Sequence, residues 1–350
     1  MGERNPVALG AILTSDAVSF GAERLDVADL ILLGLMTGAW PRFEREVSCG
    51  LALERDGVGT VSAAELNARA TQFRYARRLL SASEFTSWLA ARSLSVADLA
   101  GVLRRTLLRE RAPEGGGDAE ASELAGVLRA EAVCSGLLGK LADAAIEVMA
   151  AAHRLGRLGS DVADKRVEET VGGALGCQAA GLAALSEGAL RRRAQRLWAY
   201  EDARSALREQ VAEPAALRRQ LAGHGLDWLR LEARRLRFPA EDAAREARAL
   251  MTDDGLGADA VGAIAGIAVT TESMYLDEVP GQAAVALAAA APGEVCAPWL
   301  QDGEWNVLAV IAKAAPSAED PVLRERATAE LLAEALSRQA AGRARVHGAF

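Results

Sequence analysis

The sequence predicts a mostly α-helical protein with one small α+β domain near its C-terminus and a final helix that packs back on the helical part. Two observations predict this fold class. Helix-start signals and apolar residues at helical spacing run through residues 62–110, and residues 123–218 are helix-rich with few β-branched residues. From residue 229 onward, strand-like runs are mixed with helices, and an Asp-Gly pair separates two of those runs. Strands and helices gathered in one segment are typical of an α+β domain.

Three helices are predicted in succession within residues 62–110. Each starts with a serine that has an acidic residue three positions later, a capping box or a close relative of it that satisfies backbone N–H groups at the start of a helix. The three pairs are Ser62 with Glu65, Ser81 with Glu84, and Ser95 with Asp98. We expect a helical N-terminal domain over residues 1–118, followed by a flexible Gly-rich linker at 112–122.

The rest of the helical part and the start of the small domain follow from composition. Residues 119–228 are expected to form a second helical region. The character changes near residue 229: the segment 229–238 has strand character and ends at a proline. Helices are then expected at 240–251 and within 257–269. The small α+β domain is predicted to occupy residues 229–316.

A β-hairpin is predicted near the end of this domain. Asp302-Gly303 is a strong turn signal between the segments 295–300 and 304–312. In the second segment the two alternating faces are both apolar, except at Asn306, so this strand should lie in the interior of the sheet. One face carries Trp305, Val307, Ala309 and Ile311, and the other carries Asn306, Leu308 and Val310.

The region 317–350 is predicted to hold a C-terminal helix. Pro321 stands in its first turn, directly after Asp320, where the missing N–H of proline costs nothing. An apolar stripe follows at Leu323, Ala327, Leu331, Leu332 and Leu336. The stripe needs a partner surface, and we expect the N-terminal helical domain to provide it.

Composition excludes several classes of protein. The formal net charge of −8 argues against a dedicated nucleic-acid binder, which needs a positive face. The four cysteines lie far apart with no metal-type spacing, which predicts no metal, no disulfide framework and reduced thiols in a cytoplasm. The longest apolar runs, 30–36 and 261–269, are far shorter than the roughly 20 residues of a membrane span. We therefore expect a soluble, cytoplasmic protein without membrane insertion, and no sequence pattern calls for a cofactor.

The pattern resembles a known family. The segment "VSAAELNARATQFRYARRLLSASEFTSWLAARSLSVADLAGVLRRTLL" resembles the helical N-terminal region of SurA- and PrsA-type chaperones. The stretches from "FPAEDAAREARALM" to "APGEVCAPWLQDGEWNVLAVIAKAAPSAEDP" resemble a shortened parvulin domain, the prolyl isomerase fold of those chaperones. The pieces "GLDWLR", "APGEV", "EDPVLRERA" and "RARVHG" are similar to parvulin-like peptide-maturation proteins of clusters that make ribosomal, post-translationally modified peptides, with a crocagin-type cluster as one setting.

The departures from that family concern catalysis. Active parvulins carry a histidine pair, one on the first strand and one on the last, and the matching positions here hold Arg235 and Asn306. The aromatic floor of the proline pocket maps onto residues 280–290, which contain no aromatic residue. The resemblance therefore implies a binding groove without the isomerase machinery, and we expect no catalytic residue in it.

Candidate peptide-binding residues come from this comparison and from exposed apolar patterning. Trp299 and Trp305 flank the predicted turn and either pack the sheet core or line a groove. Met274 and Tyr275 lie in a predicted loop, and they either line a groove or pack in the core. Arg235 could bind a carboxylate or a peptide carbonyl. The full candidate set is Arg235, Arg237, Phe238, Met274, Tyr275, Leu276, Trp299, Trp305 and Asn306.

Other charged and polar residues have less specific interpretations. The basic run Arg191, Arg192, Arg193 and Arg196 is either a solvated helix face or a grip for an acidic leader peptide. The three histidines, His153, His224 and His347, are scattered and are expected to be structural or solvated. The sequence "GLGADA" at 255–260 lacks the preceding strand that a dinucleotide site needs.

The function predicted from these features is peptide binding without catalysis. The protein would hold or sequester a ribosomal precursor peptide or its modified product, combining backbone pairing along a sheet edge with a few apolar anchors. Tailoring enzymes of the same pathway are the expected further partners, and a homodimer is left open. The alternative is a divergent prolyl isomerase that uses Asn306, and a third interpretation is an interaction scaffold with an empty groove.

Overall fold

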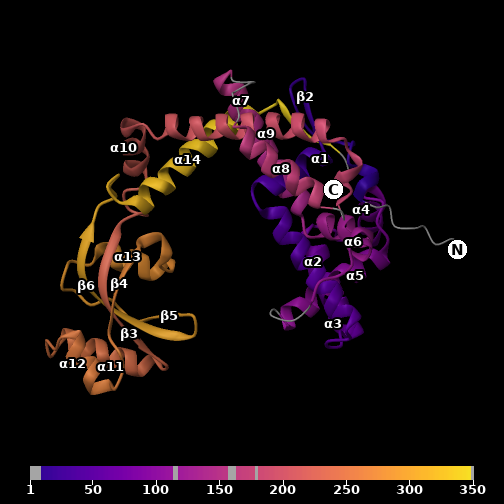
Figure 1. Ribbon diagram of the computed structural model, residues 1–350. Helices are drawn as coiled ribbons and strands as arrows, with labels where there is room; N and C mark the ends of the chain where they lie inside the picture. Colours follow the sequence, from indigo (N-terminus) through magenta and orange to yellow (C-terminus); the bar gives the residue numbers. More distant parts are fainter. Residues whose placement is uncertain (1–8, 113–116, 157–162, 178–179, 348–350) are drawn as a thin grey trace. The chain divides into compact units, whose positions relative to one another are not determined.

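The computed structural model describes residues 9–112, 117–156, 163–177 and 180–347. Helices dominate the described chain, and the strands form two small sheets, so the predicted mostly α fold class is confirmed (Figure 1). The chain divides into two compact units, one of residues 1–207 and 334–350 and the other of residues 208–333. Within the described residues, no helix is both long enough and apolar enough to cross a bilayer.

The first unit is built mainly of helices with one small sheet (Figure 1). Its elements are η1 (Leu9–Ile12), β1 (Asp16–Phe20), β2 (Glu23–Asp26), α1 (Val27–Met36), α2 (Ala39–Arg55), α3 (Ala63–Ala76), α4 (Ala82–Ala91), α5 (Val96–Arg111), α6 (Ala121–Cys134), α7 (Leu137–Leu155), α8 (Asp164–Gly176), η3 (Leu182–Ala184), most of α9 (Glu187–Val211), the end of α14 (Pro321–Ala340) and β7 (Ala344–Val346).

All three predicted capping boxes are present. They begin α3, α4 and α5, and in each the serine hydroxyl accepts a bond from the backbone N–H three residues on while the acidic side chain caps the serine N–H. Behind them, buried side chains of α3, α4, α5 and α6 form one apolar cluster that includes Phe73, Leu89 and Leu99. The predicted linker falls between α5 and α6; its residues 113–116 lie outside the described residues, and 117–120 form neither helix nor strand.

A three-stranded sheet in the first unit was not predicted. Its order is β2-β1-β7, so the end of the chain pairs with its beginning, with Phe20 opposite Ala344 and Val18 opposite Val346. Directly after β7, the side chain of His347 contacts β1: its Nε2 lies 2.6 Å from Ser19 Oγ. The strands are only three to five residues long, too short for alternation to stand out in the sequence.

The second unit contains the predicted α+β domain. An antiparallel sheet in the order β4-β3-β6-β5 forms its centre. Besides the end of α9 and most of α14, its elements are α10 (Pro214–Gly223), β3 (Arg230–Phe238), α11 (Glu241–Thr252), α12 (Ala258–Ala265), β4 (Thr270–Tyr275), η4 (Leu276–Glu278), α13 (Gly281–Ala289), β5 (Trp299–Gln301) and β6 (Glu304–Ala314).

The predicted hairpin is confirmed. Asp302 and Gly303 both have positive φ, 52° and 83°, which is the conformation of a two-residue type I′ turn between β5 and β6. The first strand is shorter than predicted: only 299–301 pair continuously with β6, and upstream of them Val295 forms a single bridge to Ala309. β6 lies between β3 and β5, so its predicted interior position is also confirmed.

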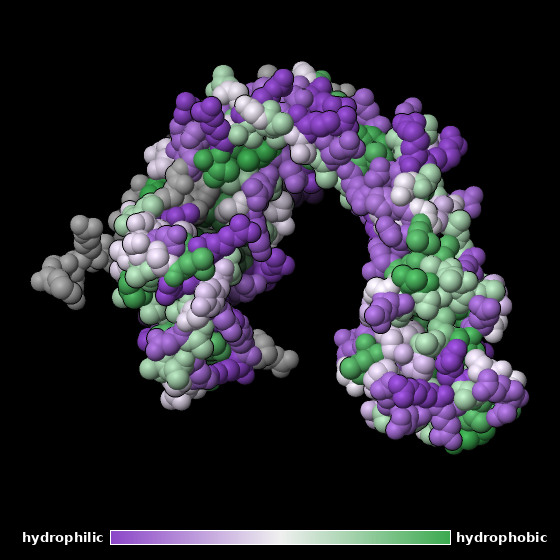
Figure 2. All heavy atoms as spheres, turned by 180° about the vertical axis from the view of Figure 1, so that it is seen from behind, coloured by the Kyte–Doolittle hydropathy of each residue, from purple (hydrophilic) through white to green (hydrophobic). Residues whose placement is uncertain are grey.

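Each face of this sheet buries its own apolar cluster, as the two apolar faces of β6 predict. One cluster joins Leu236, Phe238 and Val307 to α11 and α12. The other joins Leu231 and Leu308 to side chains of α13 and its flanking segments. Seen from behind in Figure 2, apolar side chains gather at mid-height of this unit, and hydrophilic and hydrophobic ones are mixed at its lower end.

The segment around Met274 was predicted as a loop, and that prediction is wrong. Residues 270–275 form β4, which pairs antiparallel with β3, with Met274 opposite Leu231. β4 is an edge strand whose residues are all exposed or only half-buried. Polar side chains there stay in contact with water and cost little free energy of desolvation. They also hide the apolar alternation that identifies a strand.

The C-terminal helix α14 packs back on helical elements, as the predicted fold class has it, but the N-terminal domain is not the partner of its first half. In the second unit Leu323, Ala327 and Leu331 pack with Leu217 and Leu221 of α10. From Glu334 onward the chain belongs to the first unit, where it continues into β7.

Candidate functional site

Arg235 is the centre of a polar network on the α13 side of the sheet. It lies on β3, with β4 on one side and β6 on the other. Its guanidinium donates from Nε to Asn306 Oδ1 at 2.7 Å, from one terminal nitrogen to Glu272 Oε2 at 2.8 Å, and from the other to Gln301 Oε1 at 3.4 Å. Only 14% of the side chain is exposed. The guanidinium is thus fixed by partners from three neighbouring strands.

Asn306 is fully buried, and both the oxygen and the nitrogen of its side-chain amide are hydrogen-bonded. Its Oδ1 accepts from Arg235, and its Nδ2 donates to the backbone carbonyl of Glu304 at 2.9 Å. A buried amide needs such partners because leaving it unpaired costs the desolvation free energy of the group. Arg235 and Asn306, the two residues at the expected positions of the histidine pair, are therefore in contact, and their hydrogen bonds are made to the protein itself.

Glu272 supplies the negative charge of the network. It accepts from Arg235, from Arg237 at 3.0 Å and from the Thr270 hydroxyl at 2.9 Å. Burial by itself would raise the pKa of Glu272, but the hydrogen bonds from Arg235 and Thr270 and the two arginine charges together lower it. The carboxylate is therefore held ionised. Nothing in the sequence analysis singled out Glu272, because it lies in the segment that was predicted as a loop.

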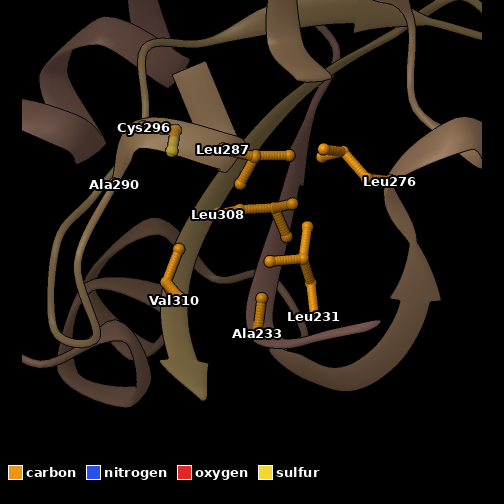
Figure 3. Close-up of a cluster of buried hydrophobic side chains, with 8 residues drawn as sticks. All are labelled: Leu231, Ala233, Leu276, Leu287, Ala290, Cys296, Leu308 and Val310. Carbon is orange, nitrogen blue, oxygen red and sulfur yellow. The ribbon is translucent and has the colours of Figure 1, made fainter. Parts of the chain in front are cut away.

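The strand register places this network and an apolar cluster on the same face. Opposite partners in a sheet share a face, and Ala233 lies opposite Glu272, Arg237 opposite Asn306, and Trp299 opposite Asn306. Ala233 belongs to the cluster shown in Figure 3, where the leucine side chains from the sheet, η4 and α13 point toward one another. This face of the sheet is therefore apolar under α13 and polar beyond it.

Trp299 marks the border between the apolar and the polar half. Its side chain is half-buried, packs against the cluster of Figure 3, and donates from Nε1 to Gln301 Oε1 at 3.4 Å. The next residue on this short edge strand, Leu300, is 55% exposed. The β5 edge thus combines an aromatic side chain, an amide already linked to Arg235 and an exposed leucine.

The remaining predicted residues do not gather at this place. Phe238 and Trp305 belong to the cluster on the opposite face, with α11 and α12. Leu276 is buried in the cluster of Figure 3, and Met274 packs against it. Tyr275 lies beside α14: its hydroxyl and Asp320 Oδ2 are 2.9 Å apart, and the Arg326 guanidinium lies 4.6 Å from its ring centroid.

A hollow of about 680 Å³ lies near the α13 face but outside the polar network. It is lined by α11, the end of α13 and the segment that leads to β5, including Met251, Ala290 and Cys296. The many small side chains along α13 make this space, and the sequence analysis noted only that residues 280–290 lack an aromatic.

The basic run of α9 is largely neutralised within the first unit. Arg191 pairs with Glu168 and Glu187, and both Arg193 and Arg196 pair with Asp29. A hollow of about 550 Å³ is bordered by Arg192, Arg193 and Arg196, but not by Arg191. Most of the positive charge there is thus already balanced by carboxylates of the protein.

No metal-binding constellation is found among the described residues. No group of three or more potential ligands is close enough to hold a metal ion there. Burial raises the pKa of Cys134 and of Cys177 to about 12, so both thiols stay protonated at neutral pH. Of the histidines, His153 packs on Phe20 and His224 stacks on Trp228, both in structural contacts.

Comparison with known proteins finds similar solved structures but does not show the family of this chain. No protein-family model matches the sequence, and no curated protein sequence matches it. Among solved structures, the chain is similar to the peptidylprolyl isomerase PrsA of Bacillus anthracis, at 12% identity over 55% of this chain and 93% of that one, with a TM-score of 0.26. It is similar to the foldase protein PrsA of Lactococcus lactis, at 10% identity over 95% of both chains, with a TM-score of 0.29.

A third similar structure comes from Campylobacter jejuni, from work on PEB4 and Cj1289 as SurA-like chaperones. Its identity is 10% over 93% of this chain and 92% of that one, with a TM-score of 0.21. Identities and TM-scores of this size are too low to transfer an activity or a residue role to this chain.

Proposed function

We propose that this protein binds peptides without catalysing a reaction on them. The observation that carries the proposal is the state of the polar network on the α13 face. Arg235 and Asn306 direct their hydrogen bonds at each other, at neighbouring strands and at the backbone of β6, at a place where an isomerase needs groups oriented toward a substrate. The face then offers a fixed floor for a bound chain, with Trp299 as an aromatic anchor at its border.

A second segment of the bound chain would pair its backbone with the free edge of β4, the edge opposite to β5 in the strand order. This edge strand is six residues long, twice the length of the edge strand β5, and it contributes Glu272 and Thr270 to the floor. Leu276 N–H bonds back to Leu229, and Tyr275 N–H bonds to Glu278. Because N–H groups alternate in direction along an antiparallel strand, the N–H of Thr271 points outward, as that of Tyr275 does. Strand addition at such an edge is a common mode of peptide recognition.

The peptide that we propose is a ribosomal precursor peptide or its modified product, held in the cytoplasm for tailoring enzymes of one pathway. This part of the proposal is supported by the short sequence pieces that resemble peptide-maturation proteins, among them "APGEV" and "EDPVLRERA".

The first test uses reduced, carboxymethylated α-lactalbumin as a permanently unfolded probe. Fluorescence anisotropy should show binding to the intact protein. Trp299→Ala should weaken binding by about thirtyfold, since an aromatic hot spot contributes about 2 kcal/mol. Thr271→Pro, which removes one outward N–H, should weaken it as well, while Thr271→Ala should not. Unchanged affinity in Trp299→Ala and Thr271→Pro would show that the site is elsewhere.

A second measurement separates holding from catalysis. The cis-to-trans relaxation of the chromogenic peptide succinyl-Ala-Leu-Pro-Phe-p-nitroanilide should proceed at the same rate with and without the protein. Acceleration that disappears in Asn306→Ala would contradict the proposal and establish the divergent isomerase instead. Acceleration that survives in Asn306→Ala would point to a contaminating isomerase.

A further inference from the structure

A second hollow in the first unit has the character of a binding site for acidic peptides. It measures about 350 Å³ and opens where α3, α5 and α6 meet. Phe73, Val102 and Leu103 line it with apolar surface. Arg77 and Arg109 line it with positive charge. An apolar floor with cations around it matches a ligand that carries apolar and acidic groups side by side.

Arg77 is a half-buried cation without a carboxylate partner. Its guanidinium carbon lies 3.8 Å from the centroid of the Phe73 ring, and one terminal nitrogen donates to the backbone carbonyl of Cys134. Among the described residues, no carboxylate lies within ion-pair distance of it. Burial lowers the pKa of Arg77, as expected for a cation that is partly removed from water. An incoming carboxylate would offset that cost.

Arg109 is the second such cation. Its terminal nitrogens donate to the backbone carbonyl of Glu46 at 2.8 Å and to the hydroxyl of Thr106 at 3.3 Å. In the part of the chain that the structure describes, it too has no carboxylate within ion-pair distance. A third arginine of this hollow, Arg69, is different because it pairs with Glu110.

The one carboxylate among the described residues that line the hollow already forms an ion pair within the protein. Glu131 is 1% exposed and accepts from Arg105 Nε at 2.6 Å. Arg105 also pairs with Glu54 at 3.2 Å, so its own charge is balanced within this group. The charge of Arg109 acts on Glu131 as well, but no hydrogen bond joins the two. The hollow therefore retains positive charge.

We infer that this hollow binds an acidic, amphipathic peptide segment, in which a carboxylate contacts Arg77 and Arg109 and a neighbouring apolar side chain enters over Phe73. This inference rests on the proposed peptide-binding function and adds a second contact site to it. The basic run of α9 is the less favourable place for an acidic segment, because Arg193 and Arg196 already pair with Asp29.

The test uses an amidated, fluorescein-labelled peptide that alternates glutamate and leucine, and a matched peptide with glutamine in place of glutamate. Anisotropy with the full chain should show binding of the glutamate peptide and at least about tenfold weaker binding of the glutamine peptide, the loss expected for charge-assisted hydrogen bonds. Arg77→Met and Arg109→Gln should each weaken the glutamate peptide about tenfold. Arg192→Gln, an exposed arginine of α9, is the matched control and should change nothing.

Other outcomes would overturn the inference. Equal affinity for the two peptides, or no binding of either, excludes charge recognition, and this comparison holds even where a variant folds poorly. A loss in Arg192→Gln would move the site to α9. A glutamine peptide with a free C-terminus that binds through Arg77 would assign the carboxylate to a chain end instead of a side chain, and would support the site. Binding of unfolded α-lactalbumin with no binding of the glutamate peptide would contradict this inference and leave the proposed function standing.

Discussion

Arg235 Nε donates to Asn306 Oδ1 at 2.7 Å across the β3–β6 ladder, and both groups lie at the border of an apolar core. The pair joins two strands that are 71 residues apart in the sequence. A hydrogen bond between a charged donor and a fully buried amide is costly to break from one side, because the other partner stays buried and unpaired.

We therefore expect Arg235→Met to destabilise the second unit. It leaves Asn306 Oδ1 unpaired and removes one partner of Glu272, so the free energy of unfolding should fall by about 1–3 kcal/mol. Urea denaturation followed by tryptophan fluorescence measures it. Arg237→Met is the matched control: that side chain is 50% exposed, and the change should cost less than about 1 kcal/mol. Equal losses in the two variants would show that Arg235 is no more important than a surface ion pair.

The lowered pKa of Glu272 predicts a pH dependence of stability. A carboxyl whose pKa is lower in the folded than in the unfolded protein stabilises the fold above its unfolded pKa, about 4.3 for glutamate. That contribution is lost as the pH falls through the lower, folded pKa. The stability difference between the native protein and Glu272→Gln should thus be constant near neutral pH and shrink below about pH 4.3. Glu246→Gln, an exposed change on α11, provides the control, and a difference that grows on acidification would contradict the prediction.

The turn between β5 and β6 predicts an asymmetry between two glycine substitutions. Gly303 has φ 83°, so Gly303→Ala should lower the free energy of unfolding by about 1–2 kcal/mol, although no atom lies within 4 Å of the added Cβ. Gly281 starts α13, has no positive φ and also has open space at its Cβ. Gly281→Ala should be neutral or stabilise by up to about 1 kcal/mol. Thermal unfolding of both variants decides, and a stable Gly303→Ala would mean that the turn is not type I′.

Local signals in the sequence predicted the elements that depend on local chemistry. The capping boxes fixed the starts of α3, α4 and α5, and Asp302-Gly303 fixed the hairpin. Pairings between distant segments left no such signal. β7 pairs with β1 across more than 300 residues, and β4 has too many polar side chains to be recognised as a strand. Missing β4 meant missing Glu272.

The candidate site was predicted only in part for the same reason. Family resemblance placed Arg235 and Asn306 together, and the structure brings them into contact. Alternation along β6 correctly divided its side chains between two faces as far as Val310, where a shift in register leaves Ile311 outside both clusters. Proximity to the turn grouped Trp299 with Trp305, which lie on opposite faces. Whether a side chain near a turn joins one face or the other depends on register, and a shift of one residue reverses it.

The buried ion pair of the first unit gives the last prediction. Glu131 and Arg105 have side-chain exposures of 1% and 7%, and their 2.6 Å contact holds α5 against α6. Glu131→Gln removes the charge but not the shape, leaving Arg105 with Glu54 alone, and should cost about 3 kcal/mol of unfolding free energy. The double variant Arg105→Met, Glu131→Leu should recover much of that loss, because it buries no unpaired charge. Arg104→Met, on the exposed side of α5, should cost less than about 1 kcal/mol. If the double variant were less stable than Glu131→Gln, the pair would be stabilising beyond what charge balance explains, and denaturant titration of the three proteins distinguishes these results.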